Sequence, residues 1–373
     1  MNLHRHKLTF VEIVTLGVVG AGVIWISNMS LRTRPTSRAD IKRAAAVKTA
    51  QAFECVKAYR IQTQMGIDSL DDPQESGLIG VDKSPITTDI GDLESKLTSV
   101  NPNWAAMVID NLVKANVKPG EAVAVGMTGS FPALNTAVII ALETYGVEPL
   151  WISSEGSSNW GANIPGLTWL DMERLMREKG LIKGHALAAT LGGANNVGGG
   201  LTHEGRDILR DAIHINKVPL IETLPLSVSV EKQLAVYSKA AGTKPISLYI
   251  NVGGGLGSLG TSRVAGVLKP GLNHPRIYLE IKDEPVQGNV AFFLKKGIPV
   301  LNLLNIVPLA RSVGLPVAAG ATPDPGVGSL FSLPAYSLLI NALLFLAYGV
   351  LVLAVAFGFT DSFIKNPRKE QVV

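Results

Sequence analysis

Cysteine and charge are both scarce in this chain. Cys55 is the only cysteine among 373 residues, which excludes an internal disulfide framework and a zinc site made of several thiolates. Charged residues make up 17% of the chain, below the roughly 25% of an ordinary soluble domain. Since no cluster of Lys and Arg interleaved with aromatic residues is present either, we predict that the protein does not bind nucleic acid.

Common signatures of phosphate and metal sites are also missing. No G-x-x-x-x-G-K-[ST] motif for the phosphates of ATP occurs, and no group of His, Cys, Asp and Glu has the spacing of metal ligands. We therefore predict no metal ion and no cofactor.

Long apolar runs, in contrast, stand near both ends of the chain. Leu8–Ser27 is apolar apart from Glu12, and Pro334–Phe359 has no charged residue. Both reach the roughly 20 residues that a helix needs to cross a bilayer. Because no small-x-small cleavage site precedes Asn28, an uncleaved anchor fits the first run better than a signal peptide. We predict transmembrane helices at residues 8–28 and 334–359, an N-terminal tail at residues 1–7 and a basic tail at residues 360–373.

Two spans place both termini on one side of the membrane and the intervening chain on the other. Lys and Arg flank both sides of the predicted spans in similar numbers, but long domains cross membranes largely regardless of charge. We therefore expect a cell-membrane protein with cytoplasmic termini and an extracytoplasmic main domain.

The segment between the spans begins with a helical pattern and continues as an alternation of strands and helices. Residues 29–65 are rich in Ala, Lys, Arg and Gln, which predicts a juxtamembrane helix. Residues 66–332 contain short apolar runs without polar alternation, typical of a parallel sheet that is covered on both faces. The predicted domain is α/β, with a mostly parallel, Rossmann-like sheet between helices. Its strands are expected at residues 121–126, 147–153, 185–191, 245–250 and 297–304.

The hexapeptide NVGGGL occurs twice, at Asn196–Leu201 and at Asn251–Leu256. Each copy comes after a predicted strand, and in an open parallel sheet the loops at the carboxyl ends of the strands form the ligand crevice. Consecutive glycines bring backbone N–H groups close to a ligand, which suits an anion. The alternative is that they only permit tight turns, but matched positions of the two copies favour a shared site. Neither copy is a G-x-G-x-x-G fingerprint for a dinucleotide.

The crevice would be formed by four loops, at residues 127–135, 153–164, 192–204 and 251–262. Trp160 in the second loop either covers it or packs on a neighbouring loop. Bulky replacements of Gly199 and Gly254 are expected to abolish binding. The predicted ligand-binding residues are Thr128, Gly129, Ser130, Asn135, Ser154, Asn159, Asn195, Asn196, Gly198, Gly199, Asn251, Gly253, Gly254 and Gly255.

A catalytic serine is the alternative to simple binding. Ser130 follows a predicted strand and precedes a predicted helix, the place of the nucleophile in a G-x-S-x-G turn, although its surroundings, TGSFP, lack the second glycine. His203 follows the first NVGGGL copy and is the candidate general base. The pattern therefore leaves both a binding site and a Ser130–His203 pair open.

Four stretches resemble the poly-γ-glutamate system protein family: GLIGVDKSPITTDIGDLESKLTSVNPNWAAMVID, GMTGSFPALNTAV, PLWISSEGSSNWGANIPGLTWLDME and YINVGGGLGSLGTS. The resemblance covers about residues 77–320 and both anchors. It implies a membrane protein that takes part in synthesis, export or processing of poly-γ-glutamate at the cell envelope. The implied partners are the synthase subunits and an anionic polymer or glutamate-like ligand.

Three functions are compatible with these features. The first is a membrane-anchored accessory protein that binds an anionic, glutamate-like ligand in the glycine-rich crevice. The second is a serine-dependent amide hydrolase or γ-glutamyl transferase that acts on the polymer. The third is a structural scaffold for synthase subunits.

Overall fold

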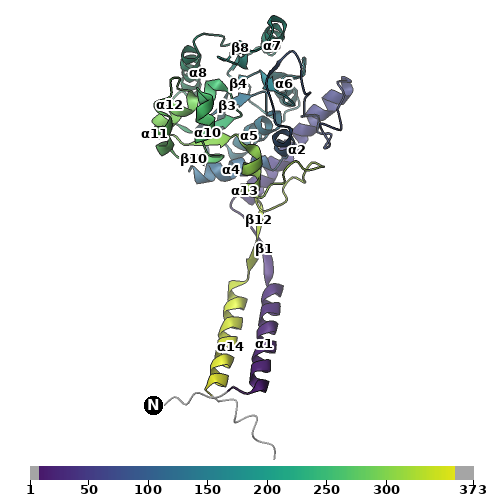
Figure 1. Ribbon diagram of the computed structural model, residues 1–373, viewed down its shortest axis with the longest axis vertical. Helices are drawn as coiled ribbons and strands as arrows, with labels where there is room; N and C mark the ends of the chain where they lie inside the picture. The colour runs from purple at the N-terminus through teal and green to yellow at the C-terminus, as the bar shows by residue number, and fades with distance from the viewer. Residues whose placement is uncertain (1–7, 358–373) are drawn as a thin grey trace, which may run out of the picture. The chain divides into compact units, whose positions relative to one another are not determined.

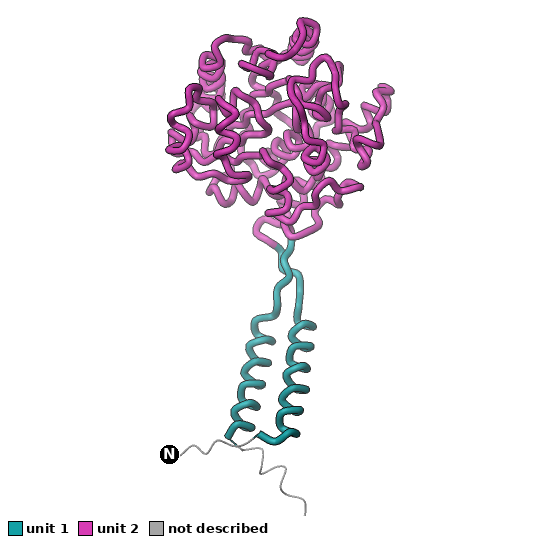
Figure 2. Tube along the Cα trace, viewed as in Figure 1, with its two compact units in different colours: residues 1–35, 332–373 teal, residues 36–331 magenta. Residues whose placement is uncertain are grey.

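The structure is a computed structural model that describes residues 8–357. It divides the chain into two compact units, shown in separate colours in Figure 2. The terminal unit comprises residues 1–35 and 332–373, and the central unit comprises residues 36–331.

Two long apolar helices make up most of the terminal unit. They are α1 (Phe10–Met29) and α14 (Leu338–Ala356), which pack against each other (Figure 1). Tyr348 donates a hydrogen bond to the carbonyl oxygen of Leu16 at 3.2 Å, and Asn341 Nδ2 donates one to Ser30 Oγ at 3.1 Å. Only 6% of the most apolar stretch of either helix is buried. Each helix is thus long, apolar and exposed, unlike a buried core helix.

The second apolar helix begins later than the sequence predicts. Pro334 lies in β12 (Ser332–Tyr336), which pairs antiparallel with β1 (Leu31–Pro35). The helix starts only after Ser337, whose side chain accepts a hydrogen bond from the backbone of Ile340 and so caps it. Residues 358–359 and both predicted tails, at residues 1–7 and 360–373, lie outside the described residues.

The central unit opens with a long helix, α2 (Ala39–Gln62). It occupies the middle of the predicted helix at residues 29–65, whose first part is strand β1 instead. Lys42 on this helix is buried, and its ammonium contacts Asp110 Oδ1 at 2.7 Å and the carbonyl oxygen of Leu330 at 2.7 Å. Lys42, one of the Lys and Arg residues that follow the first apolar run, therefore has structural partners inside the central unit.

A six-stranded sheet forms the centre of this unit, in the order β10-β11-β9-β3-β4-β6. All neighbours are parallel except β10, a three-residue edge strand that the sequence analysis did not predict. The five predicted strands are all present, which confirms the mostly parallel α/β fold. The strands are β3 (Ala122–Thr128), β4 (Glu148–Ser154), β6 (Ala188–Thr190), β9 (Ile246–Val252), β10 (Gly271–Asn273) and β11 (Val300–Leu303).

Helices cover both faces of the sheet (Figure 1). Side chains of the strands alternate between two hydrophobic cores, one on each face. In β3, Val123 and Val125 enter one core, whereas Ala122 and Ala124 enter the other. The first core is completed by α2, α4 (Trp104–Lys114), α5 (Pro132–Tyr145), α6 (Trp169–Glu178), α7 (His203–Ile215) and α13 (Ile306–Val313). The second is completed by α8 (Leu226–Ala241), α9 (Leu256–Leu259), α10 (Ser262–Val267), α11 (Tyr278–Ile281) and α12 (Asn289–Lys295).

Short elements fill the connections that follow the strands. They are β2 (Thr87–Asp89), which pairs with β5 (Ser157–Ser158), β7 (Gly192–Gly193), which pairs with β8 (Val197–Gly199), the helix α3 (Leu93–Ser99), and a 3-10 turn at Pro275–Ile277.

Candidate functional site

The strand order places a switch point at the centre of the sheet. From β3 the chain moves outward through β4 to β6, and it then returns to β9 on the other side of β3. In such sheets ligands bind outside the carboxyl ends of the two strands at which the direction reverses. Here those ends are Thr128 of β3 and Val252 of β9, and Thr128 Oγ1 donates a hydrogen bond to the carbonyl oxygen of Val252 at 3.3 Å.

A cavity of about 680 Å³ lies at this switch point. Its volume is within the usual range of small-molecule sites, roughly 300–1,000 Å³. Loops after β3, β4, β6, β9 and β11 all contribute to its lining, together with the segment at residues 88–96. Glycines and hydroxyl-bearing residues dominate this lining, and its charged residues are Asp89, Asp92 and Lys96.

Both NVGGGL copies reach this cavity, but not in matched positions. The second copy begins inside β9, so that its glycines directly follow the strand. The first copy begins six residues after the end of β6 and contains β8. Their backbones differ as well, since Gly198 and Gly200 have positive φ in the first copy, whereas only Gly253 does in the second. The predicted equivalence of the copies is therefore wrong, although Gly199 and Gly200 meet Gly254 and Gly255 in one cavity lining.

The structure separates the predicted ligand-binding residues into two groups. Those that line the cavity are Thr128, Ser130, Ser154, Gly199, Gly254 and Gly255. The others do not line it: Gly129, Asn135, Asn159, Asn195, Asn196, Gly198, Asn251 and Gly253.

Most asparagines of the second group form hydrogen bonds that hold the loops around the cavity. Asn135 lies on α5 and donates to the carbonyl oxygen of Thr128 at 2.9 Å, and Asn251 donates to Asn302 Oδ1 at 2.9 Å. Asn196 is buried, and its side-chain oxygen accepts a hydrogen bond from Thr190 at 2.9 Å. Asn159 Oδ1 accepts from the backbone of Gly91 at 2.8 Å.

Trp160 also packs on a neighbouring loop and does not cover the cavity. Its indole N–H donates to Asp71 Oδ2 at 2.9 Å, and the cavity lining does not include it.

The second NVGGGL copy runs into a literal G-x-G-x-x-G match, Gly255–Gly260 (GLGSLG), which the hexapeptide alone does not contain. In a dinucleotide site this motif opens a long helix whose N-terminus faces the pyrophosphate. Here α9 has four residues and is followed by Gly260, where a Cβ would lie 2.3 Å from the carbonyl oxygen of Val286. Glu280, twenty residues on, is exposed and outside the cavity lining. The last glycine of the motif therefore permits close packing of the end of α9 against the segment that leads into α12, and α9 is too short to be the long helix of a dinucleotide site.

No hydrogen bond links Ser130 to His203 in the described residues, and only Ser130 lines the cavity. Ser130 lines the cavity, and its Oγ accepts a hydrogen bond from the backbone N–H of Ser158 at 3.0 Å. His203 is the exposed first residue of α7, outside the cavity lining, and among the described residues its imidazole has no hydrogen bond.

Lys96 is the site residue that the sequence analysis missed. It lies on α3, is 2% exposed, and its ammonium group contacts Ser158 Oγ at 2.8 Å and the carbonyl oxygen of Ser130. The Phe131 ring lies 4.3 Å from the same nitrogen. Burial lowers the pKa of Lys96 to about 7, against a smaller opposing effect of Asp92. A seven-residue helix carries too little periodicity to reveal in advance that its lysine points inward.

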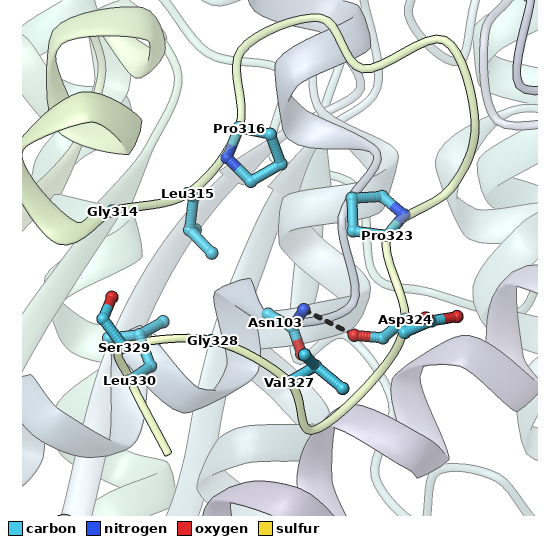
Figure 3. Close-up of a pocket in the computed structure, with 10 residues that line it drawn as sticks. All are labelled: Asn103, Gly314, Leu315, Pro316, Pro323, Asp324, Val327, Gly328, Ser329 and Leu330. Carbon is cyan, nitrogen blue, oxygen red and sulfur yellow. Dashed lines mark hydrogen bonds between the residues drawn. The ribbon is translucent and has the colours of Figure 1, made fainter. Parts of the chain in front are cut away.

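A smaller cavity, of about 170 Å³, lies beside the loop that follows α13 (Figure 3). Asn103 fastens this loop, since its Nδ2 donates to the carbonyl oxygen of Asp324 and its Oδ1 accepts from the backbone of Gly326, both at 2.9 Å. These bonds occupy both the donor and the acceptor end of the Asn103 amide.

Among residues 8–357 no three His, Cys, Asp or Glu side chains gather closely enough to hold a metal ion.

In comparisons with known proteins, no family model, no curated protein and no solved structure matches the chain.

Proposed function

We propose that this chain is a membrane-anchored accessory protein that binds a glutamate-like ligand, or an anionic polymer built from it, in the switch-point cavity. Its role would be in synthesis, export or processing of poly-γ-glutamate at the cell envelope. One observation carries this proposal. The four stretches that resemble the poly-γ-glutamate system protein family are far apart in the sequence, yet each supplies lining residues to this cavity: residues 88–96, 128–131, 154–158 and 254–262.

The chemistry of the cavity suits a ligand with carboxylate and amide or ammonium groups. Protonated Lys96 can donate to a carboxylate, and so can the N–H groups of Gly254 and Gly255, which no hydrogen bond occupies in the described residues. Asp89 and Asp92 line the same cavity and can accept from amide or ammonium N–H groups. A γ-linked glutamate unit offers both kinds of group.

The terminal helices support the membrane part of the proposal. In water, two exposed apolar helices of 20 and 19 residues would lose the free energy that burial of their side chains provides. In a bilayer the same surfaces face lipid, and the helices satisfy their own backbone groups.

Gly254 offers a clean test of the cavity as binding site. A Cβ on Gly254 would meet no heavy atom within 4 Å, so the side chain of Gly254→Leu can enter the cavity without disturbing the loop. Gly199 does not suit this purpose, because a Cβ there would lie 2.6 Å from the carbonyl oxygen of Ala194.

The experiment is calorimetric titration of a short γ-glutamyl oligomer into the full-length protein in detergent. We expect binding by the wild type and by the matched control Gly254→Ala, and at least tenfold weaker binding by Gly254→Leu. Unchanged affinity of a folded Gly254→Leu variant, or absence of binding by the wild type, would contradict the proposal.

A further inference from the structure

A serine and a buried lysine form a hydrogen-bonded pair in the wall of the switch-point cavity. Ser158 Oγ lies 2.8 Å from Lys96 Nζ, and both residues line the cavity. Among the described residues, Lys96 Nζ is the only hydrogen-bond partner of this hydroxyl group. A ligand in the cavity can therefore reach the serine oxygen on its free side.

The surroundings of Lys96 allow it to act as a base. No described carboxylate forms a salt bridge with its nitrogen, and its remaining polar contact is the carbonyl oxygen of Ser130, which can only accept. A neutral amine has two N–H groups and one lone pair. It can thus donate to Ser130 while its lone pair accepts the O–H of Ser158. Burial, which lowers the pKa of Lys96 to about 7, favours this neutral form near neutral pH.

The position of the serine is fixed independently of the lysine. The backbone N–H of Ser158 donates to Ser130 Oγ at 3.0 Å, which ties β5 to the loop between β3 and α5. The neighbouring Ser157 is buried, and its hydroxyl group donates to the carbonyl oxygen of Gly129 at 3.1 Å. Ser158 therefore lies on a segment that hydrogen bonds hold in place, as catalysis by a positioned group would require.

We propose that Ser158 is a nucleophile and Lys96 its general base, and that together they transfer an acyl group from an amide held in the cavity. Serine–lysine pairs perform this chemistry on unrelated folds. Ser130 would be a positioning residue, since it acts through Ser158. The nucleophilicity of Ser158 does not depend on the identity of the ligand, whereas the choice of a γ-glutamyl amide as substrate rests on the proposed function.

The reaction balances with water as the second substrate. Lys96 takes the proton of Ser158 as Oγ bonds to the amide carbon, and the ammonium returns that proton to the leaving nitrogen as the C–N bond breaks. Water then attacks the acyl-serine ester, giving one proton to Lys96. The ester C–O bond breaks, and the proton passes to Ser158 Oγ. The net change is hydrolysis of an amide to a carboxylic acid and an amine, or transpeptidation if an amine replaces water.

A fluorophosphonate probe tests the proposal on the full-length protein in detergent. We expect the probe to modify Ser158, identified by peptide mass spectrometry, at a rate that rises with pH around a midpoint near pH 7, the pKa of Lys96. The other charged residues of the cavity lining are Asp89 and Asp92. Ser158→Ala should remove the modification, and Ser238→Ala, at an exposed serine on α8, should leave it unchanged.

Lys96 variants distinguish a base from a structural contact. Lys96→Met and Lys96→Arg should each lower the rate of modification at least a hundredfold, the usual contribution of a positioned base. Lys96→Arg keeps the charge and the stem, so that it remains informative if Lys96→Met does not fold. Modification of Ser130 in place of Ser158, no modification of the wild type, or wild-type rates in a folded Lys96→Arg variant would each overturn the proposal.

The two proposals fail in different ways. Ser158→Ala should still bind the γ-glutamyl oligomer. If the wild type binds the oligomer but is not modified by the probe, the nucleophile is refuted and the binding function stands. If Ser158 is modified but no oligomer binds, the proposed ligand is refuted and the serine–lysine pair stands.

Discussion

Gly253 leaves no space for a side chain against Thr128: a Cβ on Gly253 would lie 2.4 Å from Thr128 Oγ1. The backbone of Gly253 also has φ +85°, in the left-handed region that glycine alone adopts freely. These two residues stand at the ends of β9 and β3, where the switch point opens the cavity. The close approach of the two strand ends therefore depends on the first glycine of the triplet.

Two adjacent glycines of the triplet should differ in how much stability an alanine replacement costs. Gly253→Ala should lower the free energy of unfolding by about 1 to 3 kcal/mol, because of its φ and the contact with Thr128. Gly254→Ala should change it by less than about 0.5 kcal/mol, since its φ is not positive and its Cβ meets open space. Denaturant unfolding of the full-length protein in detergent measures both. Equal stabilities of the two variants would contradict the close packing of Gly253 against Thr128.

Two buried glutamates, Glu155 and Glu173, should respond differently to replacement by glutamine. Glu155 accepts hydrogen bonds from the hydroxyl group of Ser153 and from a backbone N–H. Glu173 accepts from the indole N–H of Trp151 at 2.7 Å and from the backbone of Ala186 at 2.9 Å. A hydroxyl group can turn to accept from an amide, but two N–H donors cannot. We expect Glu155→Gln to be tolerated and Glu173→Gln to cost about 1 to 3 kcal/mol of stability.

The same glutamates predict how stability changes with pH. Burial raises the pKa of both carboxyl groups to about 7. Because the folded state then binds protons that the unfolded state releases above about pH 4.5, stability should fall as pH rises from about 5 to 7. The slope is at most about 1.4 kcal/mol per pH unit for each group. Glu155→Gln should remove its share of this slope. A pH-independent wild type between these values would refute the shift.

Cysteine labelling can show on which side of the membrane the central unit lies, provided that the cysteine is first moved to an exposed position. Cys55 is half-buried, and burial raises the pKa of its thiol, so that its reaction with a maleimide should be slow even in permeabilised cells. Leu70 is 88% exposed. Leu70→Cys in a Cys55→Ser background should label rapidly with an impermeant maleimide in intact cells if the central unit is extracytoplasmic, as we expect. Labelling only after permeabilisation would reverse the orientation.

The packing of the terminal helices can be tested by a disulfide. Ser27 Oγ donates a hydrogen bond to Asn341 Oδ1, which joins α1 to α14. Ser27→Cys with Asn341→Cys, in the Cys55→Ser background, should cross-link on oxidation, and the terminal fragments should then stay joined after proteolysis of the central unit. Val18→Cys with Asn341→Cys is the control, because position 18 lies about 13 Å further along α1. Failure of the first pair to cross-link would contradict the helix packing.

The strands could be predicted from the sequence because buried parallel strands have a simple pattern of apolar residues. A strand such as β3 is covered on both faces, so nearly every residue from Ala122 to Thr128 is apolar or small. The loops at the carboxyl ends followed from the same topology. The edge strand β10 escaped prediction because three residues with one glycine carry no alternation, and only pairing with β11 makes them a strand.

The site was harder to predict because it depends on contacts between distant segments. The asparagines of the predicted set were chosen for their loops, but their amides turn inward to fasten backbone groups. Lys96 and Ser158 are separated by 62 positions and meet only through the fold. No local sequence pattern distinguishes Lys96 from a lysine that is exposed to solvent.

The divergent shapes of the two NVGGGL copies also bear on the history of the domain. Duplication of a strand–loop–helix module would have preserved the phase between strand end and glycines, yet the copies begin six residues after β6 and within β9 respectively. This difference in phase argues against an origin of the two copies in duplicated half-domains. Each copy instead supplies small residues to the lining of one cavity, so that the repeated hexapeptide meets the same local need for a side-chain-free backbone in two different loop geometries.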